Sequence, residues 1–144
     1  MIIELATSLV FLAQSVYGPA TSTPEIIEST KLKANLPLTL EDHVKDYFKD
    51  DPLLAEIAKC ESNYRHFGRN GKIIRGVQNS DDVGVMQINE QYHASQSKKL
   101  GFDIYTLEGN MAYAKWLYEK QGARPWKASS KCWDDFKDEL AVKK

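Results

Sequence analysis

One glutamate falls in an unexpected position on an apolar helix surface. At about 100° per residue, Glu61 lies about 20° from Leu54 around the helix expected here, between Ile57 and Ala58. Desolvation in such a stripe disfavours the charged carboxylate and raises its pKa, as general acid catalysis near neutral pH requires. In the alternative interpretation, Glu61 turns to solvent at the helix end or pairs with Arg65.

Two helices are expected to position this carboxyl group. Thr39 and Asp42 are typical of a capping box, which predicts a first helix running to Lys49. Asp51 is a good N-cap for the second helix, and Pro52 suits its first position. The apolar stripe of the second helix consists of Leu53, Leu54, Ile57 and Ala58.

Residues 64–89 have the pattern of strands and turns. Asn70-Gly71 is a strong turn signal between residues 64–67 and 73–77, which predicts a short antiparallel sheet there. Residues 83–89 could add a third strand or lead into the next helix. Further along, we expect helices over residues 90–100 and 107–121, a loop through Cys132-Trp133 and a short terminal helix. The pattern predicts a mainly helical α+β fold.

Composition favours one folded domain with few classes of partner. The chain has 144 residues, of which 42% are hydrophobic and 27% charged, so disorder is disfavoured. The 19 Lys and Arg residues are scattered among 20 Asp and Glu, and we therefore expect no nucleic-acid partner. Gly68, Gly71 and Gly76 match no phosphate-binding motif, and we expect no cofactor.

The cysteines and the N-terminus bear on the cellular compartment. Cys60 and Cys132 are too few for a common zinc motif, so we expect no metal, and their count leaves open one disulfide or two buried thiols. Residues 1–20 resemble a secretory signal segment, with an uncleaved membrane anchor or an ordinary helix as the alternatives. Residues 21–37 indicate a linker and residues 38–144 a single domain. We expect export to the periplasm, cell wall or medium, and in such a compartment a disulfide between Cys60 and Cys132.

Three short motifs occur in a specific order. They are Cys60-Glu61-Ser62-Asn63-Tyr64, then Gly84-Val85-Met86-Gln87-Ile88-Asn89, then Asn110 opening a helix with Trp116-Leu117. Together they resemble the lytic transglycosylase and goose-type lysozyme superfamily, and Cys60 before Glu61 is also similar to the resuscitation-promoting-factor branch. The resemblance covers residues 53–133 and implies a lysozyme-like fold, with the small antiparallel sheet beside an active-site cleft.

The resemblance implies roles for the residues that match these motifs. Glu61 matches the single catalytic acid/base, and Ser62 would lie beside it. Gln87 and Asn89 match the cleft wall and would bind the N-acetyl and hydroxyl groups of an amino sugar. Each of these two amides could instead be a structural group that holds a loop.

The far side of the expected cleft departs from the family pattern. The Ala-Tyr-Asn-Ala-Gly type of motif after the last long helix is replaced by residues 122–127, which look more like the Gly and Pro-Trp loops of small lysozyme-like domains. Tyr92 and Trp126 could stack on sugar faces, although aromatic residues are more often part of a core.

Asp81 and Asp82 are the close candidates for a second carboxylate. Glycoside hydrolysis requires one, at about 5–5.5 Å from the acid as nucleophile or about 6.5–9.5 Å as a base for water. Transglycosylases use one Glu, which protonates the leaving oxygen and then deprotonates the C6 hydroxyl that closes a 1,6-anhydro ring. Because both aspartates follow Asn79-Ser80, they could simply form a solvated turn. Lytic transglycosylase activity is therefore predicted over hydrolysis.

The resemblance also implies the substrate. This would be the β-1,4 bond between N-acetylmuramic acid and N-acetylglucosamine in a peptidoglycan strand, cut by a monomeric enzyme. A lysozyme-type muramidase is the first alternative. A glycan-binding module without turnover, which would not need Glu61, and a disulfide-stabilised interaction domain are the others.

Overall fold

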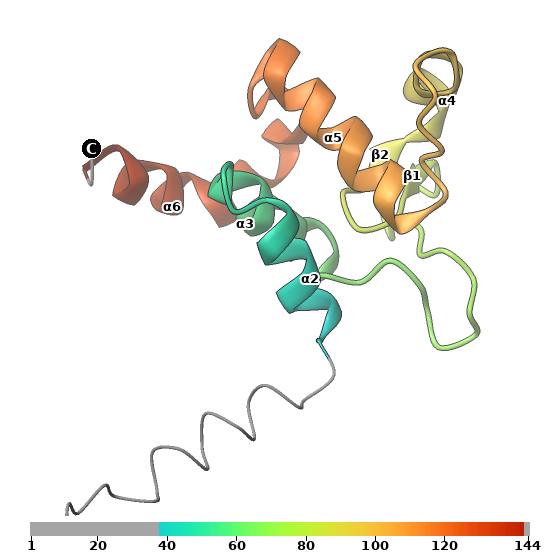
Figure 1. Cartoon of the computed structure of the whole chain (residues 1–144), viewed down its shortest axis with the longest axis horizontal. Helices are drawn as coiled ribbons and strands as arrows, with labels where there is room; N and C mark the ends of the chain where they lie inside the picture. The colour runs from blue at the N-terminus through green and yellow to red at the C-terminus, as the bar shows by residue number, and fades with distance from the viewer. Residues whose placement is uncertain (1–37, 143–144) are drawn as a thin grey trace, which may run out of the picture. The chain divides into compact units, whose positions relative to one another are not determined.

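Helix α3 (Pro52–Ser62) lies at the centre of the helical part of the fold. The computed structural model describes residues 38–142, so the expected signal segment and linker lie outside the described residues. Helix α3 contacts helix α2 (Leu40–Tyr47), the 3-10 helix η1 (Arg124–Ser129) and helix α6 (Ser130–Val142) (Figure 1). The apolar stripe of α3 is confirmed, because its residues are buried: Leu53, Leu54, Ile57 and Ala58.

The starts of α2 and α3 differ in how they are capped. The capping box of α2 is confirmed: the Thr39 hydroxyl accepts from the Asp42 N–H, and the Asp42 carboxylate accepts from the Thr39 N–H. Asp51 lies at the N-cap position of α3 but makes no capping hydrogen bond. Its carboxylate instead pairs with Lys115 at 3.2 Å, and so joins the start of α3 to another helix.

The sheet is small and lies later in the chain than expected. Strands β1 (Asp82–Val83) and β2 (Ile88–Asn89) pair antiparallel. The predicted sheet around Asn70-Gly71 is wrong, because only isolated bridges join Phe67 to Ile73 and Arg75 to Val83. Most residues from 65 to 81 are exposed, so no alternating apolar face is available to support a longer ladder.

The loop tip, residues 67–72, forms its own local structure. Gly68 N–H donates to the Lys72 carbonyl at 2.8 Å, and Gly71 N–H donates to the Gly68 carbonyl at 3.0 Å. The Asn70 side chain accepts from Lys72 N–H at 3.1 Å. Within the described part of the chain, the hydrogen bonds of the loop tip all join its own residues.

The C-terminal half is helical. Helices α4 (Glu90–Lys99) and α5 (Leu107–Gln121) form where they were predicted. The expected loop through Cys132-Trp133 is wrong, because both residues belong to α6. Trp133 is 4% exposed, and Phe136 and Leu140 follow it at helical spacing against the core, which explains why the helix begins earlier.

The structure confirms the coarse fold and the cysteine pairing. The described chain is mainly helical with one two-stranded antiparallel sheet, an α+β arrangement. Cys60 and Cys132 form a disulfide that joins α3 to α6. No helix between residues 38 and 142 has both the length and the apolar character required to cross a bilayer.

Candidate active site

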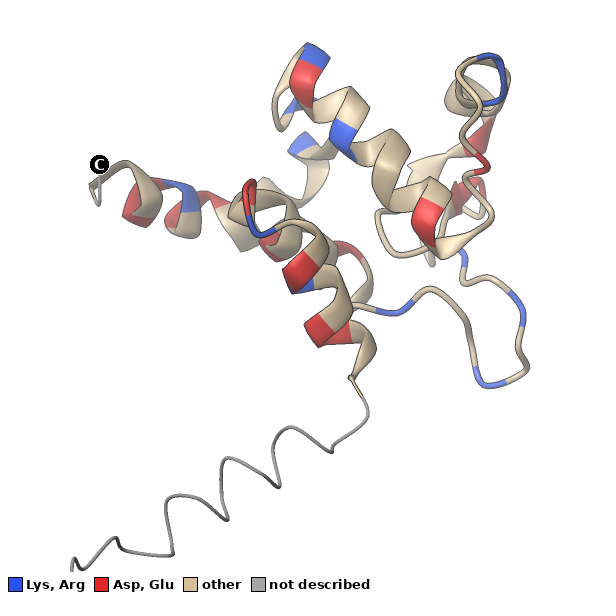
Figure 2. Cartoon of the chain, viewed as in Figure 1, with Lys and Arg blue, Asp and Glu red and all other residues tan. Residues whose placement is uncertain are grey.

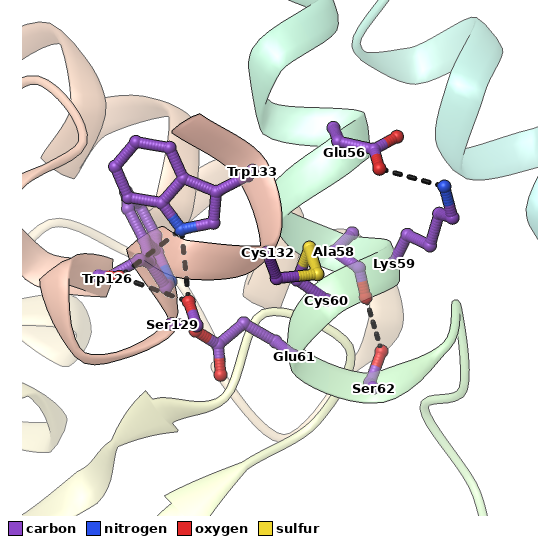
Figure 3. The surroundings of a disulfide bond; sticks show 10 residues. All are labelled: Glu56, Ala58, Lys59, Cys60, Glu61, Ser62, Trp126, Ser129, Cys132 and Trp133. Carbon is purple, nitrogen blue, oxygen red and sulfur yellow. Dashed lines mark hydrogen bonds and ion pairs between the residues drawn. A yellow bond between two sulfur atoms is a disulfide. The ribbon is translucent and has the colours of Figure 1, made fainter. Parts of the chain in front are cut away.

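Glu61 lies in the last turn of α3 with its carboxyl group partly buried. The Ser129 hydroxyl donates a hydrogen bond of 2.6 Å to Oε1 of Glu61 (Figure 3). Arg65, the alternative partner, instead donates its Nε–H to the Ser62 carbonyl at 3.1 Å. The helix therefore presents this carboxyl to a hydroxyl of η1 and not to a cation.

A short chain of hydrogen bonds orients Ser129. Trp133 Nε1–H donates to Ser129 Oγ at 3.0 Å, while the same oxygen lies 3.0 Å from the Trp126 carbonyl and 2.6 Å from Glu61 (Figure 3). Since the hydroxyl has one proton, and its shortest contact is with Glu61, the indole directs that proton toward the carboxyl group. Sequence reasoning missed Ser129 and Trp133 as partners of Glu61, because it placed Trp133 in a loop and not in a helix, where residues four apart face each other.

The disulfide lies directly beside this pair. Cys60 precedes Glu61 on α3, and Cys132 lies between Ser129 and Trp133 in sequence (Figure 3). The covalent bond therefore keeps the end of α3 next to the junction of η1 and α6, where Ser129 donates to Glu61 and Trp133 donates to Ser129.

The environment raises the pKa of Glu61 above its ordinary value of 4.5. Burial is the main cause, because it disfavours the charged form. The Ser129 hydrogen bond opposes this effect by stabilising the carboxylate, and the nearby charge of Asp82 adds to the increase. A carboxyl of this kind retains its proton at a higher pH than a solvated glutamate, which suits a general acid.

Two hollows adjoin at Glu61. One has a volume of about 370 Å³ and is bounded on the far side by α5 and η1; we call it the α5 hollow. The other has a volume of about 400 Å³ and is bounded by residues 68–77; we call it the loop hollow. Both are lined by Glu61 and Gln87, so a ligand running from one hollow to the other would pass the carboxyl group.

The turn between β1 and β2 is held from the core by buried polar side chains. Asn110 accepts from Met86 N–H at 2.9 Å and donates to the Val83 carbonyl at 3.0 Å. His66 is fully buried and accepts from Val85 N–H at 3.1 Å through Nδ1, with a pKa lowered by burial. The neutral ring is the form that can accept this bond.

Ser62 and Trp126 hold the same turn from its other side. The Ser62 hydroxyl lies 2.8 Å from the Val85 carbonyl, and Trp126 Nε1–H donates to the Met86 carbonyl at 2.9 Å. Both residues are buried, at 5% and 3% exposed, so the structure gives each a supporting role. Trp126 also lines the α5 hollow, and its stacking on a sugar remains a prediction.

Gln87 and Asn89 line the α5 hollow but already have partners. Gln87 Nε2–H donates to the Gly84 carbonyl at 2.9 Å, and its φ of +47° places it in a region that glycine favours. Asn89 caps α4 through Tyr92 N–H and donates to Asp82 Oδ1 at 2.8 Å. The left-handed backbone of Gln87 is strained for a non-glycine residue, and strain of this type concentrates at functional sites.

The remaining predicted residues differ in their position. Tyr92 is 80% exposed at the edge of the α5 hollow, where its ring is free to meet a ligand. Asp82 lines that hollow together with Glu61. Asp81 does not line it, and its backbone carbonyl accepts from Glu90 N–H at 2.8 Å. Of the two aspartates, only Asp82 shares a hollow with the candidate acid.

The distribution of charge is less even than composition suggested. Between Ser62 and Ser80 the chain has four Lys or Arg residues and no Asp or Glu. Figure 2 shows these cations along the loop that connects α3 to β1. The expectation that cations are scattered among acids throughout is therefore wrong for this segment.

No protein-family model, curated protein or solved structure matches this chain. Among residues 38–142, no group of three or more His, Cys, Asp or Glu side chains is arranged to hold a metal ion. The candidate site is therefore defined by its own geometry: one partly buried carboxyl group between two hollows.

Proposed function

We propose that this protein is a lytic transglycosylase that cleaves the β-1,4 bond between N-acetylmuramic acid and N-acetylglucosamine in peptidoglycan. The observation that carries the proposal is the placement of Glu61, with a raised pKa and a hydroxyl partner, where the two hollows adjoin. The ordered motifs that resemble the lytic transglycosylase superfamily supply the substrate class. The proposal includes a lysozyme-like fold and action as a monomer.

In the proposed reaction, Glu61 acts first as an acid and then as a base. It protonates the glycosidic oxygen as the bond from C1 of the muramic acid breaks. Its carboxylate then takes the proton of the C6 hydroxyl of the same sugar, whose oxygen forms the new bond to C1. Ser129 occupies Oε1, which leaves Oε2 to carry the transferred proton. The carboxyl group thus ends in the protonated state in which it began.

A muramidase is the second candidate, and one observation favours it. Asp82 lines the α5 hollow with Glu61, and its charge contributes to raising the Glu61 pKa. A hydrolase would use this carboxylate as nucleophile or as base for water. Asn89 donates to Asp82 Oδ1 at 2.8 Å, and so holds this carboxyl group in place in the α5 hollow.

Export is part of the proposal. The disulfide between Cys60 and Cys132 supports it, because such bonds persist in oxidising compartments and are rare in the cytosol. Peptidoglycan also lies outside the cytoplasm, so an enzyme of this type must be exported to reach it.

The test is digestion of purified peptidoglycan with mass analysis of the products. We expect wild-type protein to release 1,6-anhydromuropeptides, which are lighter by one water than hydrolysis products. Glu61→Gln should abolish the release, because the amide keeps the shape and lacks the transferable proton. Glu119→Gln, a change of an exposed residue on α5, is the matched control and should retain activity. Full activity of Glu61→Gln would overturn the assignment.

A further inference from the structure

The loop hollow differs in charge from the hollow on the other side of Glu61. Its lining includes Arg65, Lys72 and Arg75 and, apart from Glu61, no acidic residue. The α5 hollow instead contains Asp82 in addition to Glu61, together with a single Lys or Arg residue, Arg124. Together the two hollows form a groove in which Lys and Arg residues are concentrated on the loop side of the candidate acid, whereas on the α5 side one cation is balanced by Asp82.

The three cations are not equivalent. Arg75 pairs with Glu90 at 2.5 Å and donates to the Ser80 carbonyl at 2.9 Å, so its guanidinium group is committed to holding the loop. Arg65 and Lys72 are exposed, and within residues 38–142 neither forms an ion pair with a carboxylate. Arg65 uses its Nε–H on the Ser62 carbonyl, so its terminal nitrogens and the Lys72 ammonium group remain able to bind an anion.

We propose that Arg65 and Lys72 bind carboxylates on the substituent that N-acetylmuramic acid carries at C3, its lactyl group or the peptide attached to it. This inference rests on the proposed function, because it places a muramic acid residue next to Glu61. Guanidinium and ammonium groups are the usual partners of carboxylates. The loop hollow would then distinguish peptidoglycan from neutral polymers of N-acetylglucosamine, which lack this group.

A nucleic acid is the other polyanion that such a surface could attract, and the structure disfavours it. The chain has a formal net charge of −1, and the cationic stretch covers only one side of the groove. A phosphate backbone continuing along the groove would meet two carboxylates, Glu61 and Asp82, and one cation, Arg124. A glycan strand with local carboxylates avoids this repulsion, because most of its length is neutral.

The experiment measures binding by Glu61→Gln protein, which should hold substrate without cleaving it. Three ligands are compared: muropeptide fragments with intact peptides, the same fragments after an amidase has left the lactyl carboxylate, and neutral chitin oligosaccharides. The double change Arg65→Gln and Lys72→Gln removes both cations. The matched control is Lys98→Gln and Lys99→Gln, which removes two exposed lysines of α4 that line neither hollow.

We expect the double change at Arg65 and Lys72 to weaken binding of intact fragments about three- to tenfold, with a smaller effect at high salt. Chitin oligosaccharides should be unaffected, and the control should bind all ligands normally. Because the lactyl carboxyl is an amide in intact fragments, the loss measured with them reports carboxylates of the peptide. A loss that persists for amidase-treated fragments shows that the freed lactyl carboxylate is bound as well; a loss that disappears shows that the peptide carboxylates alone are bound. An equal loss for chitin, or no loss at all, would overturn the inference.

Two further outcomes separate this inference from the proposed function. In the first, the wild type cleaves peptidoglycan while the double variant binds as tightly as its parent. This result would leave the proposed function intact and refute the role of the loop hollow. Failure of the wild type to cleave peptidoglycan, with charge-dependent binding retained, would refute the activity alone. Tight binding of a single-stranded oligonucleotide that is lost in the double variant would overturn the inference, because it would show that Arg65 and Lys72 bind phosphate and not carboxylate.

Discussion

Ser129 Oγ lies 2.6 Å from Oε1 of Glu61, although 68 residues separate them in the chain. The contact joins the end of α3 to η1, and Trp133 holds the hydroxyl in place from α6. Ser129 is therefore a positioning residue for the candidate acid. It also favours the carboxylate form, in opposition to burial.

Ser129→Ala should shift the pH dependence of cleavage as well as its rate. Loss of the hydrogen bond raises the pKa of Glu61, because that bond stabilises the charged form. The acid then keeps its proton to higher pH, so the falling limb of kcat/KM should move upward in pH. We expect a rate loss of about tenfold, equivalent to about 1.4 kcal/mol.

Ser129→Thr is the control for this change, because it retains the hydroxyl group. Ser129→Thr should return the falling limb of kcat/KM to its wild-type pH and restore most of the rate. A purely structural role would predict equal losses at every pH in Ser129→Ala with no movement of the limb.

Glu61→Gln should stabilise the protein in a pH-dependent way. A carboxyl group with a raised pKa binds more protons in the folded than in the unfolded protein, so stability falls as pH rises from 4.5 through the folded pKa. The glutamine variant lacks this pH-dependent fall in stability, because its amide does not titrate. The difference in free energy of unfolding between variant and wild type should thus grow over that window and then level off, as urea denaturation at several pH values would show. A difference that is constant with pH would refute the raised pKa.

Asp82→Asn separates the two candidate reactions. If Glu61 works alone, the change should lower the rate less than tenfold, or under about 1.4 kcal/mol, and anhydro products should remain dominant. Asp81→Asn, which alters a neighbour outside the α5 hollow, is the control. A large loss of rate confined to Asp82→Asn, together with reducing-end products in the wild type, would identify a hydrolase.

Gly84→Ala should be strongly destabilising. A Cβ atom at this position would lie 2.6 Å from His66 Cε1 and 2.7 Å from Asn110 Nδ2, at a φ of +73°. Left-handed backbone costs about 1–2 kcal/mol, and overpacking adds about 1–3 kcal/mol. Gly101→Ala has a similar φ of +82° with no atom within 4 Å of the new Cβ, so it should show the backbone cost alone. Thermal unfolding of both variants measures the difference, and equal losses would contradict the close packing.

Replacing both Cys60 and Cys132 with serine should destabilise the protein and reduce its activity. Closure of a loop with a sequence separation of 72 residues stabilises by about 4 kcal/mol in the loop-entropy model, as an upper figure. Denaturant unfolding of the oxidised protein and of the double serine variant measures this loss. Two free thiols in unfolded, unreduced protein from an oxidising compartment would contradict the pairing.

Local signals predicted much of the helical framework. Periodicity and end signals located α2, α3, α4 and α5, and the apolar surroundings of Glu61 predicted its raised pKa. Those signals act over one or two turns of helix and need no knowledge of distant contacts.

The features that sequence reasoning missed depend on distant contacts. The turn signal at Asn70-Gly71 is real, but the flanking residues have no apolar face to bury, so no ladder extends from it. Ser129 and Ser62 are ordinary polar residues in sequence, and only folding shows that one holds the acid and the other a buried carbonyl. Buried hydrogen bonds between segments this far apart produce no periodic pattern in the sequence.

The loop tip, whose hydrogen bonds join residues 67–72 to one another within the described chain, has an evolutionary consequence. We therefore expect insertions or deletions there to preserve the hydrogen bonds of Ser129 and of the turn between β1 and β2. Under the proposed function, a lineage could exchange this stretch, which includes Lys72, and acquire a preference for differently substituted peptidoglycan while retaining Glu61. Selectivity and chemistry can evolve at separate rates in such a chain.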